Sequence, residues 1–334
     1  MNLKFRLALS TYTYQEIILY LTYKSSEDGM AVTVAEYLGQ RTDSVNDIIP
    51  VEKKSGALCP FMDRTCDKVS KGLPPVCSVR KFDGRIWITC EHRLCSSRTS
   101  NKNKLKIGLV SHQQQLLLSI AKFIYNNEHL TLSDVGIKRE VTIPLPEAEH
   151  SYHADYVMRN FSNNKKVDEI LLEMQGGGET SNTGKITEHI IKWSQTIPPT
   201  NELLRTSVGA NTIETNAWRR QQEQFLVKGN VVDQTGGKIV FSVGMPLFDY
   251  LYKRIRHAKL RDLRNHNWTL CLLPIEENKE IPVVDGPIPF KINQEKAIFT
   301  NYATFVRFLT DQGNPCPEIF EGEFTLLNNS IIKV

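Results

Sequence analysis

Three successive segments in the middle of the chain alternate apolar and polar residues. They begin at Glu140, His150 and Val167, and the last one ends at Gln175. Since successive side chains on a strand point to opposite faces, this period of two predicts three short strands. In the third strand one predicted face is apolar and can pack into a core, whereas the other face carries Glu173 and Gln175.

Helical and extended patterns flank these strands. Residues 107–126 place apolar side chains on one helix face, and shorter helices are predicted at 187–193, at 214–228 and after Pro246. Two further strands are predicted at 239–243 and 268–273. Strands and helices that alternate in this way predict a mixed α/β fold. The last 50 residues lack a clear period, and we expect irregular structure and short strands there.

Acidic and amide side chains coincide with the predicted strands. Asp155 lies on the second strand, and Glu173 follows 18 positions later with Gln175 beyond it. Two neighbouring carboxylates can bind Mg²⁺, which completes its shell with water and phosphate oxygens. Such an ion polarises a phosphodiester and activates water, so the pattern indicates metal-dependent phosphodiester hydrolysis. Alternatively, these residues are solvent-facing positions on half-buried strands, because one D…ExQ match is weak evidence.

Length and charge set broad limits on the protein. Its 334 residues allow one large domain and a smaller one. The formal net charge of +4 permits a nucleic-acid partner without requiring one. No stretch of about 18 uncharged apolar residues occurs, so we expect no membrane span. The first residues lack a signal-peptide pattern, which makes the cytoplasm the expected location.

Five of the seven cysteines lie between positions 59 and 95. Cys59, Cys66, Cys77 and Cys90 are separated by six, ten and twelve residues, and Cys95 follows closely. In a reducing compartment such crowding indicates a metal site, and four thiolates suit tetrahedral zinc or a single iron. The alternatives are a set of unrelated buried cysteines, or a site in which Cys95 replaces Cys90.

Several motifs together resemble one nuclease family. They are VAEYLGQR at 34–41, LCPFM at 58–62, PVC at 75–77 and WITC at 87–90, followed by EVTI at 140–143, Asp155 and LEMQ at 172–175. Their order resembles the NotI-like restriction endonucleases, a variant of the PD-(D/E)xK nuclease fold, over residues 31 to about 260. The resemblance implies a core with a central mixed sheet flanked by helices, plus a small irregular four-cysteine domain.

The resemblance also implies roles for single residues. Glu140, Asp155, Glu173 and Gln175 would form the catalytic site, with Mg²⁺ on Asp155 and Glu173 and with Glu140 in support. Gln175 would position the attacking water, although most PD-(D/E)xK nucleases carry lysine there. The four ligands of structural iron or zinc would be Cys59, Cys66, Cys77 and Cys90.

The implied protein is a prokaryotic type II restriction endonuclease. It would cut double-stranded DNA at a short palindromic site, and such a site matches a homodimer. We expect residues 1–104 to hold the four-cysteine domain, at about 31–96, and a basic linker, and residues 105–334 to hold the catalytic and DNA-binding domain. The alternatives are a modification-dependent or repair nuclease, and a non-catalytic DNA-binding protein with a degenerate nuclease core.

Basic residues outside the predicted site are candidates for DNA contact. Six of the twelve residues at 253–264 are basic, and we expect them on a helix that tracks phosphates, with Lys253, Arg254 and Arg256 foremost. Lys185, Arg219 and Arg220 are further candidates. The alternative is that these charges form a solvated helix face, or a surface between helices of two copies.

Overall fold

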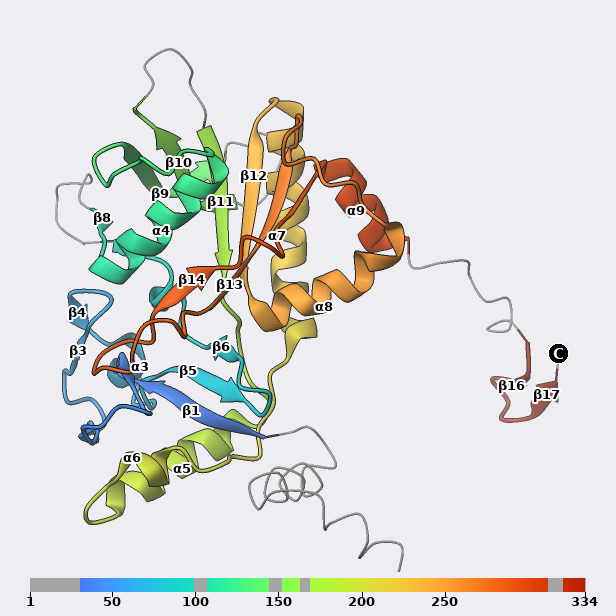
Figure 1. Cartoon of the computed structure of the whole chain (residues 1–334). Helices are drawn as coiled ribbons and strands as arrows, with labels where there is room; N and C mark the ends of the chain where they lie inside the picture. Colours follow the sequence, from blue (N-terminus) through green and yellow to red (C-terminus); the bar gives the residue numbers. More distant parts are fainter. Residues whose placement is uncertain (1–30, 99–106, 144–151, 163–168, 312–320, 334) are drawn as a thin grey trace, which may run out of the picture.

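A seven-stranded mixed sheet forms the centre of the computed structural model (Figure 1), which describes residues 31–98, 107–143, 152–162, 169–311 and 321–333. Its strands are β9 (Val135–Ile143), β10 (Tyr152–Asn160), β11 (Glu169–Gln175), β12 (Lys238–Gly244), β13 (Leu270–Glu277), β14 (Phe290–Ile292) and β15 (Ile298–Thr300). The first three are antiparallel, and β12 and β13 run parallel to β11. The predicted mixed α/β fold with a central mixed sheet is confirmed.

Helices flank both faces of this sheet. On one face α4 (Ser111–Ile124) packs with Leu172 and Met174 of β11. On the other face α7 (Glu214–Gln234), α8 (Met245–Ile255) and α9 (Tyr302–Thr310) pack with Phe241 of β12. Leu171 belongs to this second cluster. The predicted division of β11 into two faces is therefore correct, and both faces are covered.

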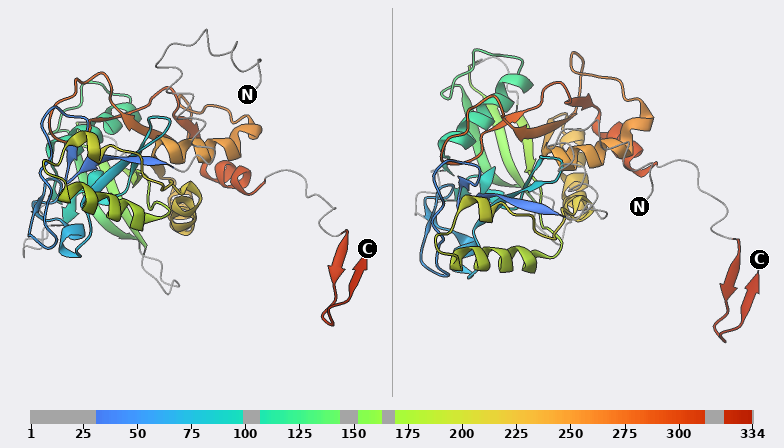
Figure 2. Two further views of the ribbon diagram at one scale, coloured as in Figure 1. Left: turned by 90° about the horizontal axis from the view of Figure 1, so that it is seen from below. Right: turned by 60° about the horizontal axis from the view of Figure 1, so that its bottom comes forward.

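A smaller antiparallel sheet lies at the amino-terminal end of the described chain. It has the order β2 (Gln40–Arg41), β1 (Val32–Tyr37), β5 (Val76–Lys81) and β6 (Ile86–Ile88). Next to β1 lie α5 (Thr183–Gln195) and α6 (Asn201–Leu204), as Figure 2 shows. The ring centroids of Tyr37 and Trp193 are 5.2 Å apart. Val32, Val34 and Tyr37 share one apolar core with α5, α7 and α8.

Short elements complete the described chain. They are β3 (Leu58–Cys59), β4 (Arg64–Thr65), α3 (Asp67–Ser70), η2 (Glu91–Arg93), β7 (Ser97–Arg98), β8 (Ile107–Gly108), η3 (Arg256–Ala258), β16 (Glu323–Thr325) and β17 (Ile331–Lys333). The helix predicted from residue 107 begins at Ser111, because residues 107–108 pair with β7 instead. None of the described helices is long and apolar enough to cross a membrane.

Two predictions for the carboxyl-terminal part need correction. The last 50 residues contain the expected short strands, β14 to β17, but also the helix α9, which buries Tyr302, Phe305 and Leu309. The basic segment at 253–264 is not one helix, because α8 ends at Ile255 and Lys259 adopts a left-handed backbone with φ 46°. The predicted domain boundary at 104 lies outside the described residues, as do residues 1–30.

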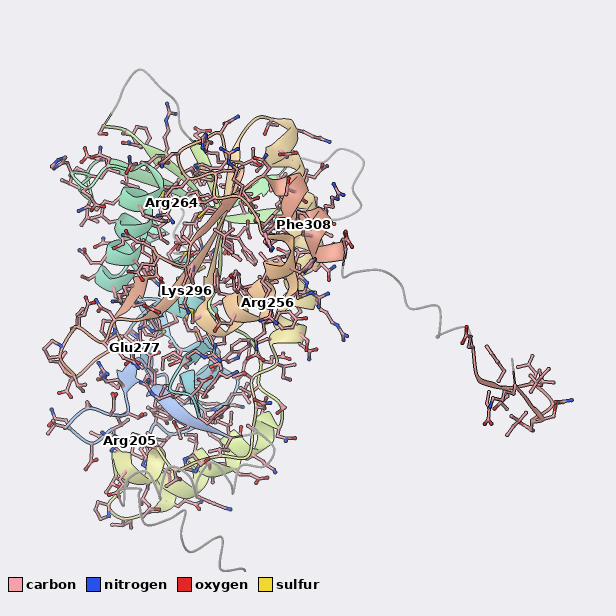
Figure 3. The ribbon with its side chains drawn as sticks, turned by 45° about the vertical axis from the view of Figure 1, so that its right-hand side comes forward. Arg205, Arg256, Arg264, Glu277, Lys296 and Phe308 are labelled. Atoms are coloured by element: carbon pink, nitrogen blue, oxygen red, sulfur yellow. The ribbon has the colours of Figure 1, made fainter. Side chains whose placement is uncertain are left out.

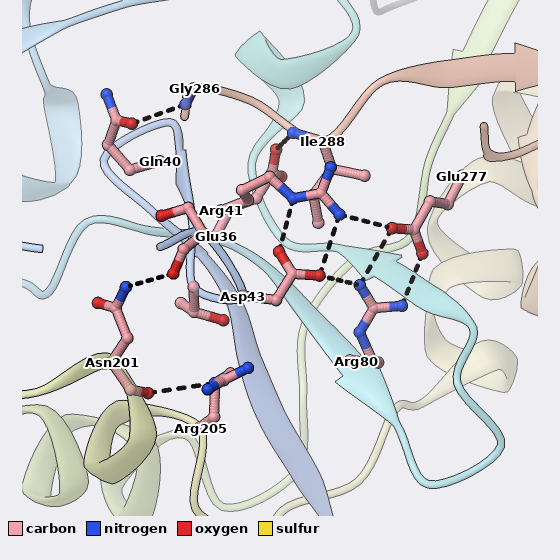
Figure 4. Close-up of polar contacts among 12 residues, drawn as sticks. Glu36, Gln40, Arg41, Asp43, Arg80, Asn201, Arg205, Glu277, Gly286 and Ile288 are labelled. Atoms are coloured by element: carbon pink, nitrogen blue, oxygen red, sulfur yellow. Dashed lines mark hydrogen bonds and ion pairs between the residues drawn. The ribbon is translucent and has the colours of Figure 1, made fainter. Parts of the chain in front are cut away.

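Charged side chains connect the small sheet to the end of β13 and to the chain that follows it (Figure 4). Arg80 and Arg41 both contact Glu277, at 2.6 and 3.3 Å, and Arg41 also lies 2.6 Å from Asp43. Glu36 accepts a hydrogen bond from the backbone N–H of Ile288 at 2.8 Å. The contacts with Glu277 and Ile288 join segments more than 190 residues apart in the sequence.

Candidate active site

Asp155 and Glu173 lie side by side on neighbouring strands. The β10–β11 register pairs Tyr156 with Leu172, which sets Asp155 opposite Glu173 on one face of the sheet. The backbone N–H of Met174 donates to Oδ2 of Asp155 at 2.9 Å. Burial raises the pKa of Asp155, and this N–H group, Lys228 and Arg139 oppose the rise. The structure thus brings the two predicted metal-binding carboxylates together.

Glu173 is buried, with 4% of its surface exposed, and so is not the solvent-facing residue of the alternative interpretation. Its Oε2 accepts a hydrogen bond from Nζ of Lys228 at 2.8 Å. Its Oε1 is buried and has no hydrogen-bond partner among the described residues. Burial, and then the charge of Asp155, raise the pKa of Glu173 to about 8, against the opposing effect of Lys228. A buried carboxylate oxygen without a partner is costly, unless a cation or water binds it.

Glu140 lies on β9, in line with Asp155 across the sheet. The register pairs Val141 with Ala154 and Arg139 with Tyr156, so that Glu140 falls between these pairs. Its φ of 50° interrupts the regular strand at this point. Its carboxylate lies 3.3 Å from Arg139, which also approaches Oδ1 of Asp155 at 3.5 Å. Glu140 therefore belongs to the same charged cluster through Arg139.

Gln175 ends β11 and is held through both ends of its amide. Its Oε1 accepts a hydrogen bond from Gln221 of α7 at 2.7 Å, and its Nε2 donates to the carbonyl of Gly177. Gln175 also lines a groove of about 580 Å³ between the end of β11 and the cysteine-rich segment. Lys68, Arg220 and Gln221 line the same groove.

Glycines at 176–178 let β11 approach the small sheet. Gly177 pairs with Ile88 of β6, and the indole N–H of Trp87 donates to the carbonyl of Gly178 at 3.0 Å. A Cβ atom at residue 177 would lie 2.6 Å from the carbonyl oxygen of Ile88. Only glycine fits this contact, which sets Gln175 beside the cysteine-rich segment.

Lys228 and Arg139 are site residues that the sequence analysis missed. Lys228 lies on α7, and its side chain is 1% exposed. A signal for it was present, because Lys228 follows Phe225 by three residues and precedes Val232 by four, on the buried stripe of the helix. A lysine at an apolar position of a helix requires a partner, and here the partner is Glu173.

The structure gathers the four predicted cysteine ligands in one cluster. Cys59, Cys66 and Cys77 are buried together with Phe61, and Cys90 packs against them. A hydrogen bond with Cys59 lowers the pKa of the Cys66 thiol to about 6, and backbone N–H groups contribute to this shift. The same hydrogen bond raises the pKa of Cys59.

Backbone N–H groups also point at the sulfur atoms of this cluster. Phe61 donates to Sγ of Cys59 at 3.4 Å, and Gly39 donates to Sγ of Cys77 at 3.3 Å. Hydrogen bonds of this kind stabilise thiolates, so the donor set suits iron or zinc. No three His, Cys, Asp or Glu side chains of the described residues are yet arranged to hold one ion. The thiols would have to draw together around the metal.

Cys95 lies outside this cluster. It is buried in the other core with Leu94, Leu116 and Leu117, whereas Cys90 contacts the cluster itself. Burial raises the pKa of the Cys95 thiol well above its usual value. The arrangement therefore favours Cys90 over Cys95 as the fourth ligand.

The six basic candidates for DNA contact do not gather on one surface. Arg220 lines the groove beside Gln175 and pairs with Glu179 at 2.7 Å. Arg219 and Arg254 line a hollow of about 370 Å³ that α7, α8 and α9 share. Arg256, Arg264 and Lys296, which are labelled in Figure 3, line a separate hollow of about 500 Å³. Lys185 and Lys253 are exposed on α5 and α8.

Comparison with known proteins gives no assignment. No protein-family model matches the chain, and no curated protein matches it.

Proposed function

We propose that this protein is a Mg²⁺-dependent, site-specific endonuclease that cuts double-stranded DNA, as a type II restriction enzyme does. The observation that carries the proposal is the pair of neighbouring carboxylates Asp155 and Glu173, in which Glu173 is buried and its Oε1 has no hydrogen-bond partner among the described residues. Two carboxylates and an open oxygen suit an ion that takes its remaining ligands from water and phosphate. When bound, Mg²⁺ supplies a Lewis acid and lowers the pKa of water.

One backbone N–H group and one side chain hold the two carboxylates in place. The N–H of Met174 fixes Oδ2 of Asp155, and Lys228 fixes Oε2 of Glu173. Both carboxylates lie on the central sheet, a rigid support that suits a catalytic site. Gln175 lines the adjoining groove, where its amide would orient a water molecule.

Digestion of a fully sequenced phage DNA tests the proposal. The wild type should give discrete bands with Mg²⁺, and Asp155→Ala should give none while still binding DNA in Ca²⁺. Glu169→Ala is the matched control, because Glu169 is an exposed acid on the same strand. A wild type that shifts DNA on a gel without cutting it would favour the non-catalytic or modification-dependent alternative. Unchanged cutting by Asp155→Ala would refute the site assignment.

We further propose that Cys59, Cys66, Cys77 and Cys90 bind one structural iron or zinc ion. Metal analysis of the purified protein should give about one iron or zinc per chain. Cys77→Ser should lose this metal, whereas Cys95→Ser, at a buried cysteine of the other core, should keep it. Metal content well below one per chain in the wild type would contradict the site.

A homodimer completes the proposal, because a palindromic site presents the same sequence to two copies related by a two-fold axis. Each copy would cut one strand. Sedimentation of the protein with a short duplex that carries the mapped site should give two chains per duplex. One chain per duplex would refute the dimer and leave the chemistry of the site in place.

A further inference from the structure

The proposed site has a neutral amide at the strand position where a lysine would stabilise developing negative charge. Gln175 can donate and accept hydrogen bonds, but it carries no charge. Lys228 reaches the same pair of carboxylates from α7, at 2.8 Å from Glu173. We propose that Lys228 supplies the fixed positive charge of the active site, which position 175 lacks. This inference rests on the proposed nuclease function.

The surroundings of Lys228 make its charge effective. Its side chain is 1% exposed, and in such a site a charge acts much more strongly than in water. A lysine is almost never fully buried unless a partner pairs with it. Burial of the Lys228 side chain is costly, and among the described residues its contact with Glu173 offsets this cost.

The packing of α7 holds Lys228 in position. A Cβ atom at the next residue, Gly229, would lie 2.0 Å from the ring of Tyr302 on α9. The hydroxyl of Tyr302 donates to the carbonyl of Leu226 at 2.6 Å. The helix is thus in close contact with α9 at the turn that carries Lys228, so the ammonium group is placed by a rigid element rather than by a loop.

Arg139 is the other cation beside the carboxylates, and its contacts differ. It donates to the carbonyl of Ser96 at 2.9 Å, and it pairs with Glu140 at 3.3 Å and with Asp155 at 3.5 Å. It thus approaches from the β9 side, where it is shared among several acceptors. Lys228 is the cation that contacts Glu173.

The reaction that this charge would assist is hydrolysis of one phosphodiester bond. The oxygen of a water molecule bonds to phosphorus, and one P–O ester bond breaks. One DNA end keeps the phosphate, and the other gains a hydroxyl whose proton comes from water by way of solvent. Negative charge grows on the phosphate oxygens during this step, and a fixed cation nearby stabilises it. Lys228 is buried against Glu173, so its role is to hold that carboxylate and to place a charge beside it.

Substitutions at 228 and 175 test the inference. Lys228→Met should lower kcat by about 100-fold or more, with KM and DNA affinity in Ca²⁺ unchanged. Lys228→Arg should keep part of the activity. The double variant Lys228→Met/Gln175→Lys should regain activity, because residue 175 lies two positions from Glu173 on the same strand face. Lys192→Met, at an exposed lysine of α5, should match the wild type.

Mn²⁺ titration by electron paramagnetic resonance adds a readout that needs no cutting. Lys228→Met should bind Mn²⁺ at least as tightly as the wild type, because a repelling charge has been removed. Full activity of Lys228→Met would overturn the inference. Weakened Mn²⁺ binding by Lys228→Met, together with no regain of activity when Gln175→Lys is added, would also overturn it, because Lys228 would then only maintain the shape of the site. A wild type that neither binds Mn²⁺ nor cuts DNA would instead refute the proposed function itself.

Discussion

Breaking the ion pair of Glu36 and Arg93 by removing one partner should strongly destabilise the protein. Both side chains are at most 1% exposed, and Nε of Arg93 lies 2.9 Å from Oε1 of Glu36. The guanidinium group of Arg93 also lies over the ring of Phe290, at 4.3 Å from its centroid. This pair joins the small sheet to the segment before β14 and to the residues beside Cys90.

Arg93→Met removes the cation and leaves the carboxylate of Glu36 buried. Loss of one partner of a buried pair costs about 3–5 kcal/mol. Glu36 keeps two donors, the hydroxyl of Ser78 at 2.7 Å and the N–H of Ile288 at 2.8 Å. We therefore expect the lower end of that range, about 3 kcal/mol. Adding Glu36→Gln should recover about 1–2 kcal/mol, since the buried charge disappears. The amide oxygen can still accept from the N–H of Ile288, and the amide N–H can donate to the hydroxyl oxygen of Ser78.

Urea unfolding followed by circular dichroism measures these differences in the free energy of unfolding. Arg64→Met is the control, because its pair with Asp67 is about half exposed and such pairs contribute less than about 1 kcal/mol. A loss below about 1 kcal/mol for Arg93→Met would refute the reasoning. A double variant no more stable than Arg93→Met would show that burial of an unpaired charge is not the cause.

Two further predictions concern stability. Burial lowers the pKa of His112 to about 3 from an ordinary value of 6.5. Between these two pH values the unfolded chain therefore binds one more proton than the folded chain. As the pH falls below 6.5, the free energy of unfolding should decrease by at most about 1.4 kcal/mol per pH unit. His112→Phe should remove this loss, so its unfolding curves should match the wild type near pH 7.5 and exceed it at pH 5; equal differences at both pH values would contradict the assignment. Gly244→Ala should lower the melting temperature strongly, because the new Cβ would lie 2.0 Å from the carbonyl oxygen of Gly176. Gly184→Ala in α5 is the control: its new Cβ would meet no atom within 4 Å, so this variant should raise the melting temperature slightly. Equal shifts of the two variants in differential scanning calorimetry would refute the steric argument.

The periodic parts of the fold could be predicted from the sequence. The alternation at 170–175 assigned both faces of β11 correctly, because one residue of each pair packs against α4 and the other against the α7 side. The short helix α9 was missed since nine residues give little periodicity. The end of α8 was misplaced because Lys259 adopts a left-handed backbone conformation, which a lysine in the sequence does not predict.

The site could be predicted only where its residues share neighbouring strands. Asp155 and Glu173 are separated by one hairpin, so the strand pattern alone brings them together. Lys228 comes from a helix 55 residues beyond Glu173, and its approach depends on how α7 packs across the sheet. Long-range packing of this kind is not encoded in local spacing. The same holds for Arg139, whose partners lie on two other segments.

The apolar core that β1 shares with α5, α7 and α8 limits how this protein can be engineered. Val32 and Val34 of the small sheet and Ile190 and Phe248 of the helices bury their side chains in the same cluster. A hybrid protein in which residues 31–96 came from a different protein would leave this face without matching side chains. Variants that test or alter the proposed function are therefore better made by substitutions along the groove beside Gln175 than by exchanging whole segments.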